Sequence, residues 1–208
     1  MSAELLAGPP YEARPLSTYS QRAEADAVVR HRIGWLVLRN LPCDFRAPAC
    51  YLAPDRLTEP VGLSEDDALI GCLLLHRSPD LRHWGPRARG QSPLITHAHS
   101  IPGAANVGRL MTLWATDFAA RLGVPCVRAE IPGCPQDASD PGGRLLRHAE
   151  NLGWENRGYG AGWCNQGQRV ARVEIPAEPR PGLGHLIRCT VLLDQAATVS
   201  AATGDGAC

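Results

Sequence analysis

The sequence contains no lysine, and all 21 of its basic residues are arginine. This absence excludes chemistry that depends on a lysine amine, such as Schiff-base formation or a lysine general base. The acidic residues also number 21, so the formal net charge is zero. A balanced charge does not favour binding to nucleic acid or to an anionic membrane surface. We therefore expect neither nucleic acid nor a membrane among the partners.

Long hydrophobic stretches are absent as well. No run reaches the roughly eighteen apolar residues that a membrane-spanning helix needs. Residues 1–16 also lack the charged and then apolar pattern of a secretion signal. The composition, 44% hydrophobic and 20% charged, is typical of a globular protein with a sizeable core. These features together favour a cytoplasmic protein.

Closely spaced cysteines are the third absence. The eight cysteines include no C-x₂-C or C-x₄-C pair, and the nearest two are Cys43 and Cys50. Zinc sites need ligands at shorter spacings than this. The sequence therefore predicts no metal site, with buried free thiols as the expected state of the cysteines.

The most informative stretch lies in the middle of the chain. Residues 94–101 alternate between two sets of side chains, which predicts a strand with His97 and His99 on one face. Apolar residues then recur at helical spacing as far as Leu122, where a glycine and a proline end the helix. Residues 126–131 form a second short strand. The pattern predicts a parallel, right-handed strand–helix–strand unit.

The start of this helix has the features of an anion site. Gly103 and Gly108 allow a tight turn between the strand and the helix. The N–H groups from about Ala104 to Arg109 lack intrahelical partners and carry about half a positive charge, so a phosphate or pyrophosphate is a natural ligand. The open alternative is a turn that binds nothing, because an isolated Gly-x-x-x-x-Gly pattern occurs widely.

Two motifs in this stretch carry a family resemblance. Residues 103–108, Gly-Ala-Ala-Asn-Val-Gly, match Arg/Gln-x-x-Gly-x-Gly/Ala in part, and residues 149–154, Ala-Glu-Asn-Leu-Gly-Trp, match Tyr-Glu-x-Leu-Gly-Phe. The chain thereby resembles the acetyl-CoA-binding core of the GNAT superfamily of N-acetyltransferases. It departs from the family at Gly103, at Asn106 and at Ala149, which takes the place of a tyrosine. Asn106 replaces a glycine, but asparagine tolerates left-handed backbone best among the other residues.

The resemblance implies an α/β (α+β) fold, a mixed, mostly antiparallel twisted sheet flanked by helices. A splay between the strands at 94–101 and 125–131 would admit the pantetheine arm of acetyl-CoA or another acyl-CoA. We expect an acyltransferase domain over 1–176, then a Pro-rich linker, a further strand within 185–193 and a tail, together 177–208. The residues expected to bind the cosubstrate are Ile101, Gly103, Ala104, Ala105, Asn106, Val107, Gly108 and Arg109.

The resemblance further implies transfer of an acyl group to an amine of a small molecule. A homodimer stays open as the oligomeric state. The amine must lose a proton, and no carboxylate lies on the 94–101 strand, so we expect His97 or His99 to be the base, with preference for His97. A purely structural histidine pair is the alternative. The family's acid, a tyrosine, is missing at Ala149, and His148 beside it is a weaker candidate.

Two other function classes stay open. One is a binding or accessory protein that keeps the fold without catalysis, which the three departures from the motifs would favour. The other is an enzyme that uses coenzyme A thioesters for decarboxylation or hydrolysis. Cys126, Trp114 and Phe118 are expected in the core and not at a site, and no role is expected for Tyr159.

The remaining elements are predicted from local patterns. A helix is expected over 17–31, capped by Ser17 or Thr18 and with Tyr19, Ala23 and Ala27 facing inward. The apolar run 33–42 predicts a buried strand, and 43–66 predicts an irregular segment. Strands are expected at 67–79, antiparallel to the one at 94–101, and at 170–175.

Overall fold

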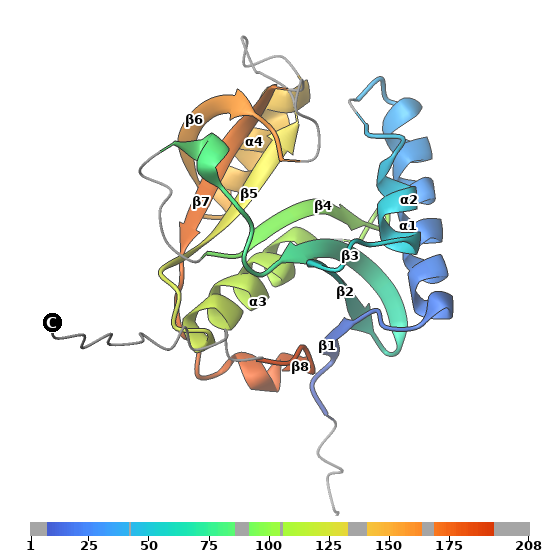
Figure 1. Cartoon of the computed structure of the whole chain (residues 1–208). Helices are drawn as coiled ribbons and strands as arrows, with labels where there is room; N and C mark the ends of the chain where they lie inside the picture. The colour runs from blue at the N-terminus through green and yellow to red at the C-terminus, as the bar shows by residue number, and fades with distance from the viewer. Residues whose placement is uncertain are drawn as a thin grey trace, which may run out of the picture.

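In the computed structural model, the described residues are 8–41, 43–85, 92–104, 106–132, 141–163 and 169–193. They form one eight-stranded sheet in the order β6-β7-β5-β4-β3-β2-β1-β8 (Figure 1). The strands are β1 Tyr11–Pro15, β2 Thr58–Glu65, β3 Ala68–His76, β4 Leu94–Ser100, β5 Cys126–Pro132, β6 Glu155–Ala161, β7 Arg169–Pro176 and β8 Ile187–Cys189. The helices are α1 Tyr19–Val37, α2 Ala47–Leu52, α3 Val107–Arg121 and α4 Pro141–Asn151, with short 3-10 helices η1 Arg82–Trp84 and η3 Leu183–His185.

The sheet is mixed but mostly antiparallel. The pairs β1–β2, β2–β3 and β3–β4 are antiparallel, and β7 pairs antiparallel with β5 and β6. Only β4 with β5, and the edge strand β8 with β1, are parallel pairs within the described residues. This topology confirms the predicted fold class, the parallel unit around α3, and the further strand expected within 185–193.

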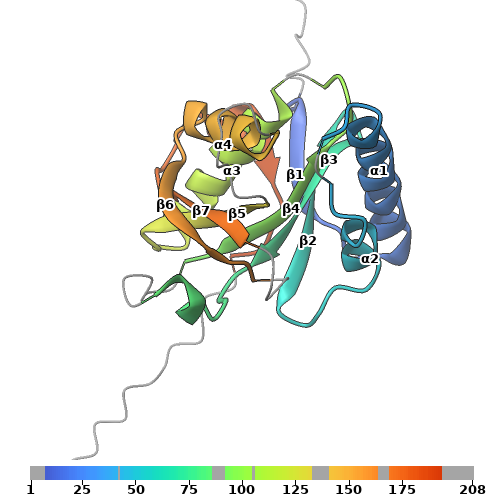
Figure 2. The same cartoon turned by 90° about the horizontal axis from the view of Figure 1, so that it is seen from above.

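Helices cover both faces of the sheet, with α1 and α2 on one side and α3 and α4 on the other (Figure 2). On the α3 side, Trp114, Phe118 and Val127 belong to a large hydrophobic core. On the α1 side, Val29 and Tyr51 belong to a smaller second cluster. Because strand side chains alternate between faces, each strand contributes to both layers.

Helix α1 confirms the predicted cap but not the predicted inward face. The Thr18 hydroxyl accepts a hydrogen bond from the Gln21 amide, and the Gln21 side chain accepts one from the Thr18 amide, which is a complete capping box. The buried residues are Ala25, Val28, Val29 and Ile33. Tyr19 is 68% exposed, so the expected inward stripe was wrong.

The strand predicted at 33–42 is the end of α1. The helix continues to Val37, and Ile33 is the one buried residue among 33–41. Trp35 stays half-buried because the guanidinium carbons of Arg32 and Arg39 lie 4.4 and 4.0 Å from its ring centroid. The apolar run therefore extends a helix that is already capped, and arginine stacking covers the tryptophan.

The segment predicted as irregular at 43–66 contains both α2 and β2. Pro48 sits in the first turn of α2, where its missing N–H costs no hydrogen bond. In β2, Pro60 and Gly62 are residues of low strand propensity, so no strand was predicted there. The pairing of β2 with β3 shifts register between Leu63 and Ser64. Tertiary pairing with β1 and β3 thus overrides weak local propensity.

Helix α3 matches its prediction closely. Trp114 and Phe118 are 2% and 1% exposed, and their rings stack with centroids 5.2 Å apart. Gly123 follows the helix in left-handed conformation with a φ of 71°. These two aromatic residues are core residues, as expected.

The segment after β7 packs on the same core as the rest of the sheet. Leu183, Ile187 and Val191 are buried in the large cluster with α3. The Trp114 indole N–H lies 3.3 Å from the Cys189 sulfur. The chain beyond residue 193 lies outside the described residues.

Candidate functional site

The centre of the sheet contains a splay between its two parallel strands. β4 and β5 pair only at Leu94 with Arg128 and at Ile95 with Ala129, and beyond these positions they run apart (Figure 1). Both strands direct their carboxyl ends to the open side of the gap. In α/β sheets this is the end at which ligands bind.

A β-bulge in β4 lies directly after the last paired residue. Thr96 pairs with Leu74 and His99 pairs with Cys72, so β4 has one more residue than β3 in this interval. His97 has a φ of 49° and its carbonyl accepts a hydrogen bond from the Tyr51 hydroxyl. The bulge places Thr96 and His99 on the same face, whereas strict alternation predicted opposite faces.

The two histidines predicted as the base lie near each other on the α1 and α2 side, in different environments. His97 Nε2 is 3.4 Å from Asp44 Oδ2, longer than an ordinary hydrogen bond. Neither His97 Nδ1 nor His99 Nε2, both buried, has a partner among the described residues. Burial, followed by the nearby His97 and Arg32, lowers the pKa of His99 to about 4, against a smaller opposing effect of Asp44.

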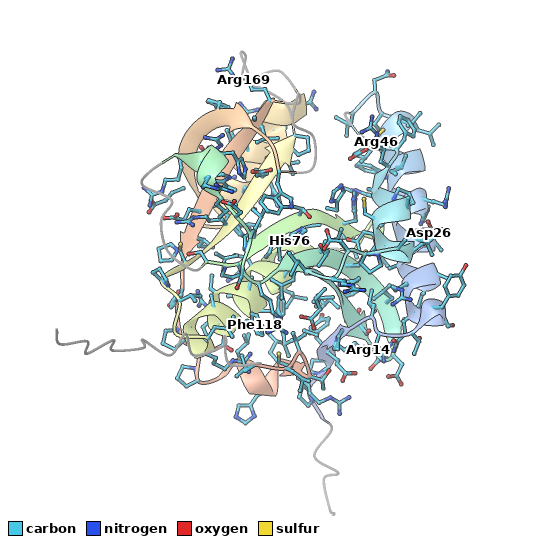
Figure 3. All side chains as sticks on the ribbon, viewed as in Figure 1. Arg14, Asp26, Arg46, His76, Phe118 and Arg169 are labelled. Atoms are coloured by element: carbon cyan, nitrogen blue, oxygen red, sulfur yellow. The ribbon has the colours of Figure 1, made fainter. Side chains whose placement is uncertain are left out.

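A hydrogen-bonded chain crosses three strands beside the splay. The Thr58 hydroxyl donates to Asp55 Oδ1 at 2.7 Å, and Thr58 Oγ1 lies 3.1 Å from His76 Nδ1. His76 Nε2 lies 2.9 Å from Thr96 Oγ1. His76 stands on the sheet between α2 and the β5–β7 strands (Figure 3). Burial, mainly, lowers the pKa of His76 below its ordinary value.

Across the splay, Glu130 of β5 organises a second polar cluster. Its carboxylate accepts hydrogen bonds from His83 Nε2 at 2.7 Å and from the Trp84 indole at 2.8 Å, as well as from the Trp163 amide at 2.6 Å. The Trp163 ring centroid lies 6.0 Å from that of His76 and 5.8 Å from that of His83. These contacts hold β5, η1 and the segment after β6 together on one side of the splay.

The predicted anion site at the start of α3 has the expected backbone. Gly103 and Asn106 are left-handed, with φ of 86° and 67°. The Asn106 side chain makes no capping hydrogen bond, so the first-turn N–H groups are not covered by a cap. Arg109 is exposed in that turn. Ala105 lies outside the described residues.

Gly108 faces α4. A side chain placed there would meet His148 Nε2 at 3.5 Å and Leu152 Cδ1 at 3.7 Å, so this glycine also permits close packing of the two helices. His148 therefore lies beside the N-terminus of α3. In sequence it precedes Ala149, which takes the place of the family's tyrosine.

The other residues predicted to bind the cosubstrate lie in the connection between β4 and α3 and at the start of α3. The Ile101 amide donates to the Ile70 carbonyl, and the Ala104 amide lies 3.4 Å from the Ile101 carbonyl. Because successive amides of a strand point to opposite edges, the Ser100 amide faces the side from which β5 has diverged. The Val107 side chain is buried in the core, so only its main chain can reach a ligand.

Other candidates are structural. Cys126 is buried, with its sulfur 3.2 Å from Ser92 Oγ. Tyr159 lies on β6 beside Asn156. Among the described residues, no three His, Cys, Asp or Glu side chains cluster as metal ligands, and no described helix is long and apolar enough to cross a membrane.

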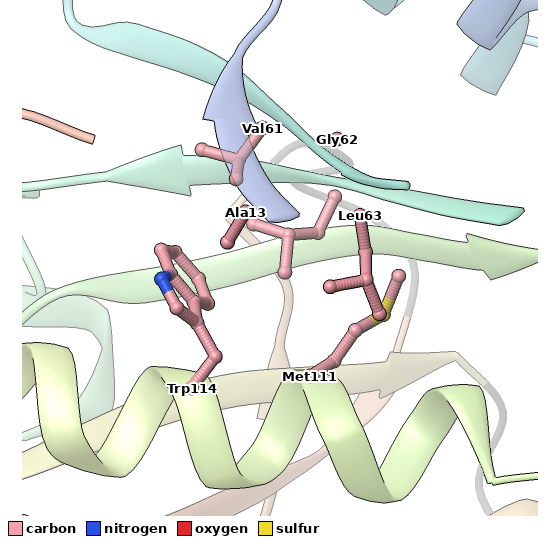
Figure 4. A pocket seen from close by; sticks show the side chains of 7 residues that line it. Ala13, Val61, Gly62, Leu63, Met111 and Trp114 are labelled. Atoms are coloured by element: carbon pink, nitrogen blue, oxygen red, sulfur yellow. The ribbon is translucent and has the colours of Figure 1, made fainter. Parts of the chain in front are cut away.

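A small recess opens on the α3 side of the sheet, away from the polar side chains (Figure 4). The residues around it are Ala13, Val61, Gly62, Leu63, Leu73, Met111 and Trp114, and none carries a charged side chain. It offers no group for chemistry and is a packing imperfection of the core.

A splayed parallel strand pair in a mostly antiparallel sheet, with two helices on each face, defines the class: the chain has the fold of the GNAT superfamily of N-acetyltransferases. No family model and no curated protein matches the sequence. The likeness is to solved structures.

An acetyltransferase assigned to the GNAT family from Desulfovibrio desulfuricans aligns with a TM-score of 0.59 at 14% identity, over 81% of this chain and 99% of that one. A GNAT acetyltransferase from Listeria monocytogenes gives 0.59 at 12% identity, over 79% and 95%. An N-acyl amino acid synthase from uncultured soil microbes gives 0.54 at 13% identity, over 80% and 92%. At these identities the comparison establishes the fold.

The polar side chains on which the splay opens were not predicted from the sequence. His76 lies within the strand predicted at 67–79 and was given no role, and neither Thr96 nor Glu130 was a candidate. Their partner Thr58 comes from the segment predicted as irregular at 43–66, and His83 comes from the stretch between the strands predicted at 67–79 and 94–101. One available clue was that a threonine and a histidine interrupt otherwise apolar strands.

Proposed function

We propose that the protein is an N-acyltransferase that moves an acyl group from a coenzyme A thioester to an amine. The observation that carries the proposal is the splay between β4 and β5, lined on one face by polar side chains, within a GNAT fold. A thioester lying between the strands would present its carbonyl carbon to an acceptor arriving from the α1 and α2 side.

The backbone around α3 fits the cosubstrate. The uncapped first turn from Asn106 to Arg109 supplies N–H groups and one exposed guanidinium for the pyrophosphate. The diverging edge of β4, including the Ser100 amide, supplies main-chain groups for the amides of the pantetheine arm. Gly103 and Asn106 hold the turn open through their left-handed backbone.

Amine acylation requires a base, because an alkylamine arrives as its ammonium ion. The pKa of about 4 makes His99 a weak base at neutral pH, which counts against this member of the predicted pair. The proposal of acyl transfer itself does not depend on which imidazole accepts the proton.

A second function class has one specific observation in its favour. Ala149 stands where the family resemblance implies the tyrosine that protonates the departing sulfur, and it packs against the core. A protein that binds acyl-CoA without transferring the acyl group would tolerate this change.

Two measurements separate the candidates. Calorimetric titration with acetyl-CoA tests binding, and release of free thiol tests turnover with a panel of primary amines that includes spermidine, free amino acids and an arylamine. We expect binding together with amine-dependent thiol release. Binding with no transfer to any amine supports the accessory protein, and absence of binding removes both.

A further inference from the structure

The direction of every hydrogen bond in the chain beside the splay follows from its ends. The single hydroxyl proton of Thr58 is donated to Asp55 Oδ1, so the Thr58 oxygen must accept from His76 Nδ1–H. A neutral His76 then carries a lone pair on Nε2, to which the Thr96 hydroxyl donates. The His76 tautomer is thus set by a carboxylate two hydrogen bonds away.

This row of hydrogen-bonded side chains runs from a buried end to an exposed end. Thr96 and His76 are 6% and 4% exposed, whereas Asp55 is exposed in the loop before β2. Thr96 directly follows Ile95, the last residue of β4 that pairs with β5. One end of the chain therefore lies at the mouth of the splay and the other lies in solvent.

We propose that these residues form a proton relay that carries the proton of the acceptor ammonium from the splay to solvent. Its members are, in order, Thr96, His76, Thr58 and Asp55. This proposal rests on the proposed acyl transfer. The Thr96 hydroxyl is the group that contacts the amine. His76 and Thr58 act through Thr96 as positioning and relay residues.

The ammonium gives one proton to Thr96 Oγ1 while the Thr96 hydroxyl proton moves to His76 Nε2. The amine lone pair then forms the C–N bond at the thioester carbonyl, and the C–S bond breaks with its electron pair on sulfur. The second proton lost by nitrogen goes to the thiolate. The first leaves from His76 Nδ1 through Thr58 to Asp55, so that ammonium and thioester become amide, thiol and one released proton.

The charged groups around His76 suit this role. Asp55 lies at the end of the chain, Glu130 faces His76 from β5, and His97 faces it from β4. The two carboxylates stabilise the imidazolium that forms transiently, and His97 opposes it. The hydrogen bonds from the Thr58 hydroxyl and the Leu57 amide lower the pKa of Asp55, so its carboxylate is ionised at neutral pH and passes a proton on to solvent readily.

His97 has no comparable route. Its Nε2 is 3.4 Å from Asp44, and its Nδ1 has no partner among the described residues. The relay therefore predicts that removal of His76 affects transfer more than removal of the adjacent His97.

Steady-state kinetics with acetyl-CoA and the best amine of the panel test the relay. Thr96→Val and His76→Gln should each lower kcat by about 10²–10⁴-fold with little change in the KM for acetyl-CoA. Both should also flatten the acidic limb of the pH–rate profile. Thr58→Val should slow transfer and Thr58→Ser should restore it. The matched control is Thr190→Val, which removes a hydroxyl near β8 and should keep the wild-type rate.

Two further readouts separate the relay from mere structure. An arylamine, which is already neutral at the assay pH, should lose far less rate in Thr96→Val than an alkylamine does. Nitrogen NMR of the ¹⁵N-labelled chain should show neutral His76 as the Nδ1–H tautomer, and Thr58→Val should shift it towards Nε2–H. The valine variants keep the threonine shape, so the test holds even if His76→Gln unfolds.

The outcomes are distinguishable. If the wild-type protein acylates amines but Thr96→Val and His76→Gln keep its rate and pH profile, the relay is wrong and the proposed function stands. A loss confined to His97→Gln, or an Nε2–H tautomer at His76, also overturns the relay. If the wild-type protein transfers to no amine, the proposed function fails and the relay fails with it.

Discussion

The two faces of the central strands differ sharply. Towards α3 and α4, the buried residues of β4 and β5 are apolar, as at Ile95, Val127 and Ile131. Towards α1 and α2, the same two strands present Thr96 and Glu130, together with the other polar side chains of the splay. The apolar face holds the sheet together, whereas the polar face contains buried nitrogens of two histidines that have no partner in the part of the chain that the structure describes.

This difference indicates that one face of the sheet provides packing and the other carries the polar groups. Buried polar atoms without partners cost stability, so their presence on one face requires a close-packed layer on the other. The α3 side supplies that layer through a stacked aromatic pair and aliphatic residues from seven of the eight strands and two helices. Substitutions on the two faces should therefore affect different properties.

The largest expected effect tests the apolar face. Trp114→Ala should lower the free energy of unfolding by about 3–5 kcal/mol, because a fully buried aromatic ring is replaced by a cavity. Urea denaturation measures the change. Tyr19→Ala is the matched control, since this aromatic residue is 68% exposed on α1 and should cost well under 1 kcal/mol. Equal losses in the two variants would contradict the assignment of the core.

The next effect tests the polar face through pH. The pKa of His99 falls to about 4 in the folded state, chiefly because of burial and then because of His97 and Arg32, with Asp44 opposing. Between the two pKa values the unfolded state binds a proton at this histidine and the folded state does not. The free energy of unfolding is therefore unaffected above about pH 6.5 and decreases as the pH falls towards 4. The loss amounts to about 3 kcal/mol at most.

Unfolding measured between pH 7 and pH 4.5 examines this loss. We expect His99→Leu to flatten the decline in stability relative to the wild-type protein. His31→Gln removes an exposed histidine of α1 and should leave the decline unchanged. A wild-type slope in His99→Leu would show that other groups cause the acid sensitivity.

The smallest effect concerns the end of the splay at which α3 begins. Arg109→Glu places a negative charge in the uncapped first turn and should weaken coenzyme A binding by about tenfold, or about 1.4 kcal/mol. Calorimetry at two salt concentrations measures it, and the effect should shrink in high salt. Arg169→Glu, an exposed charge reversal on β7, is the control. Gly108→Glu would be less informative, because Gly108 also packs against α4.

Local patterns were sufficient for the central unit. β4, α3 and β5 were predicted because their periodicity, the glycine after the helix and the following proline are signals within a few residues of one another. The left-handed Asn106 was anticipated from the family resemblance, in which a glycine takes this position, and from the tolerance of asparagine for this backbone. Prediction failed at 33–42 and 43–66, where arginine stacking on Trp35 and strand pairing across β1 and β3 override local propensity.

The sequence by itself determined the order of the central elements, the turn that begins α3 and the aromatic residues of its buried face, because each depends on neighbours along the chain. Only the tertiary structure decided which polar groups meet at the splay. Asp55, His76 and Thr96 come from three separate segments, and the bulge at His97 brings Thr96 and His99 onto one face. Such contacts arise from sheet pairing and register, which the periodicity of a single strand does not specify.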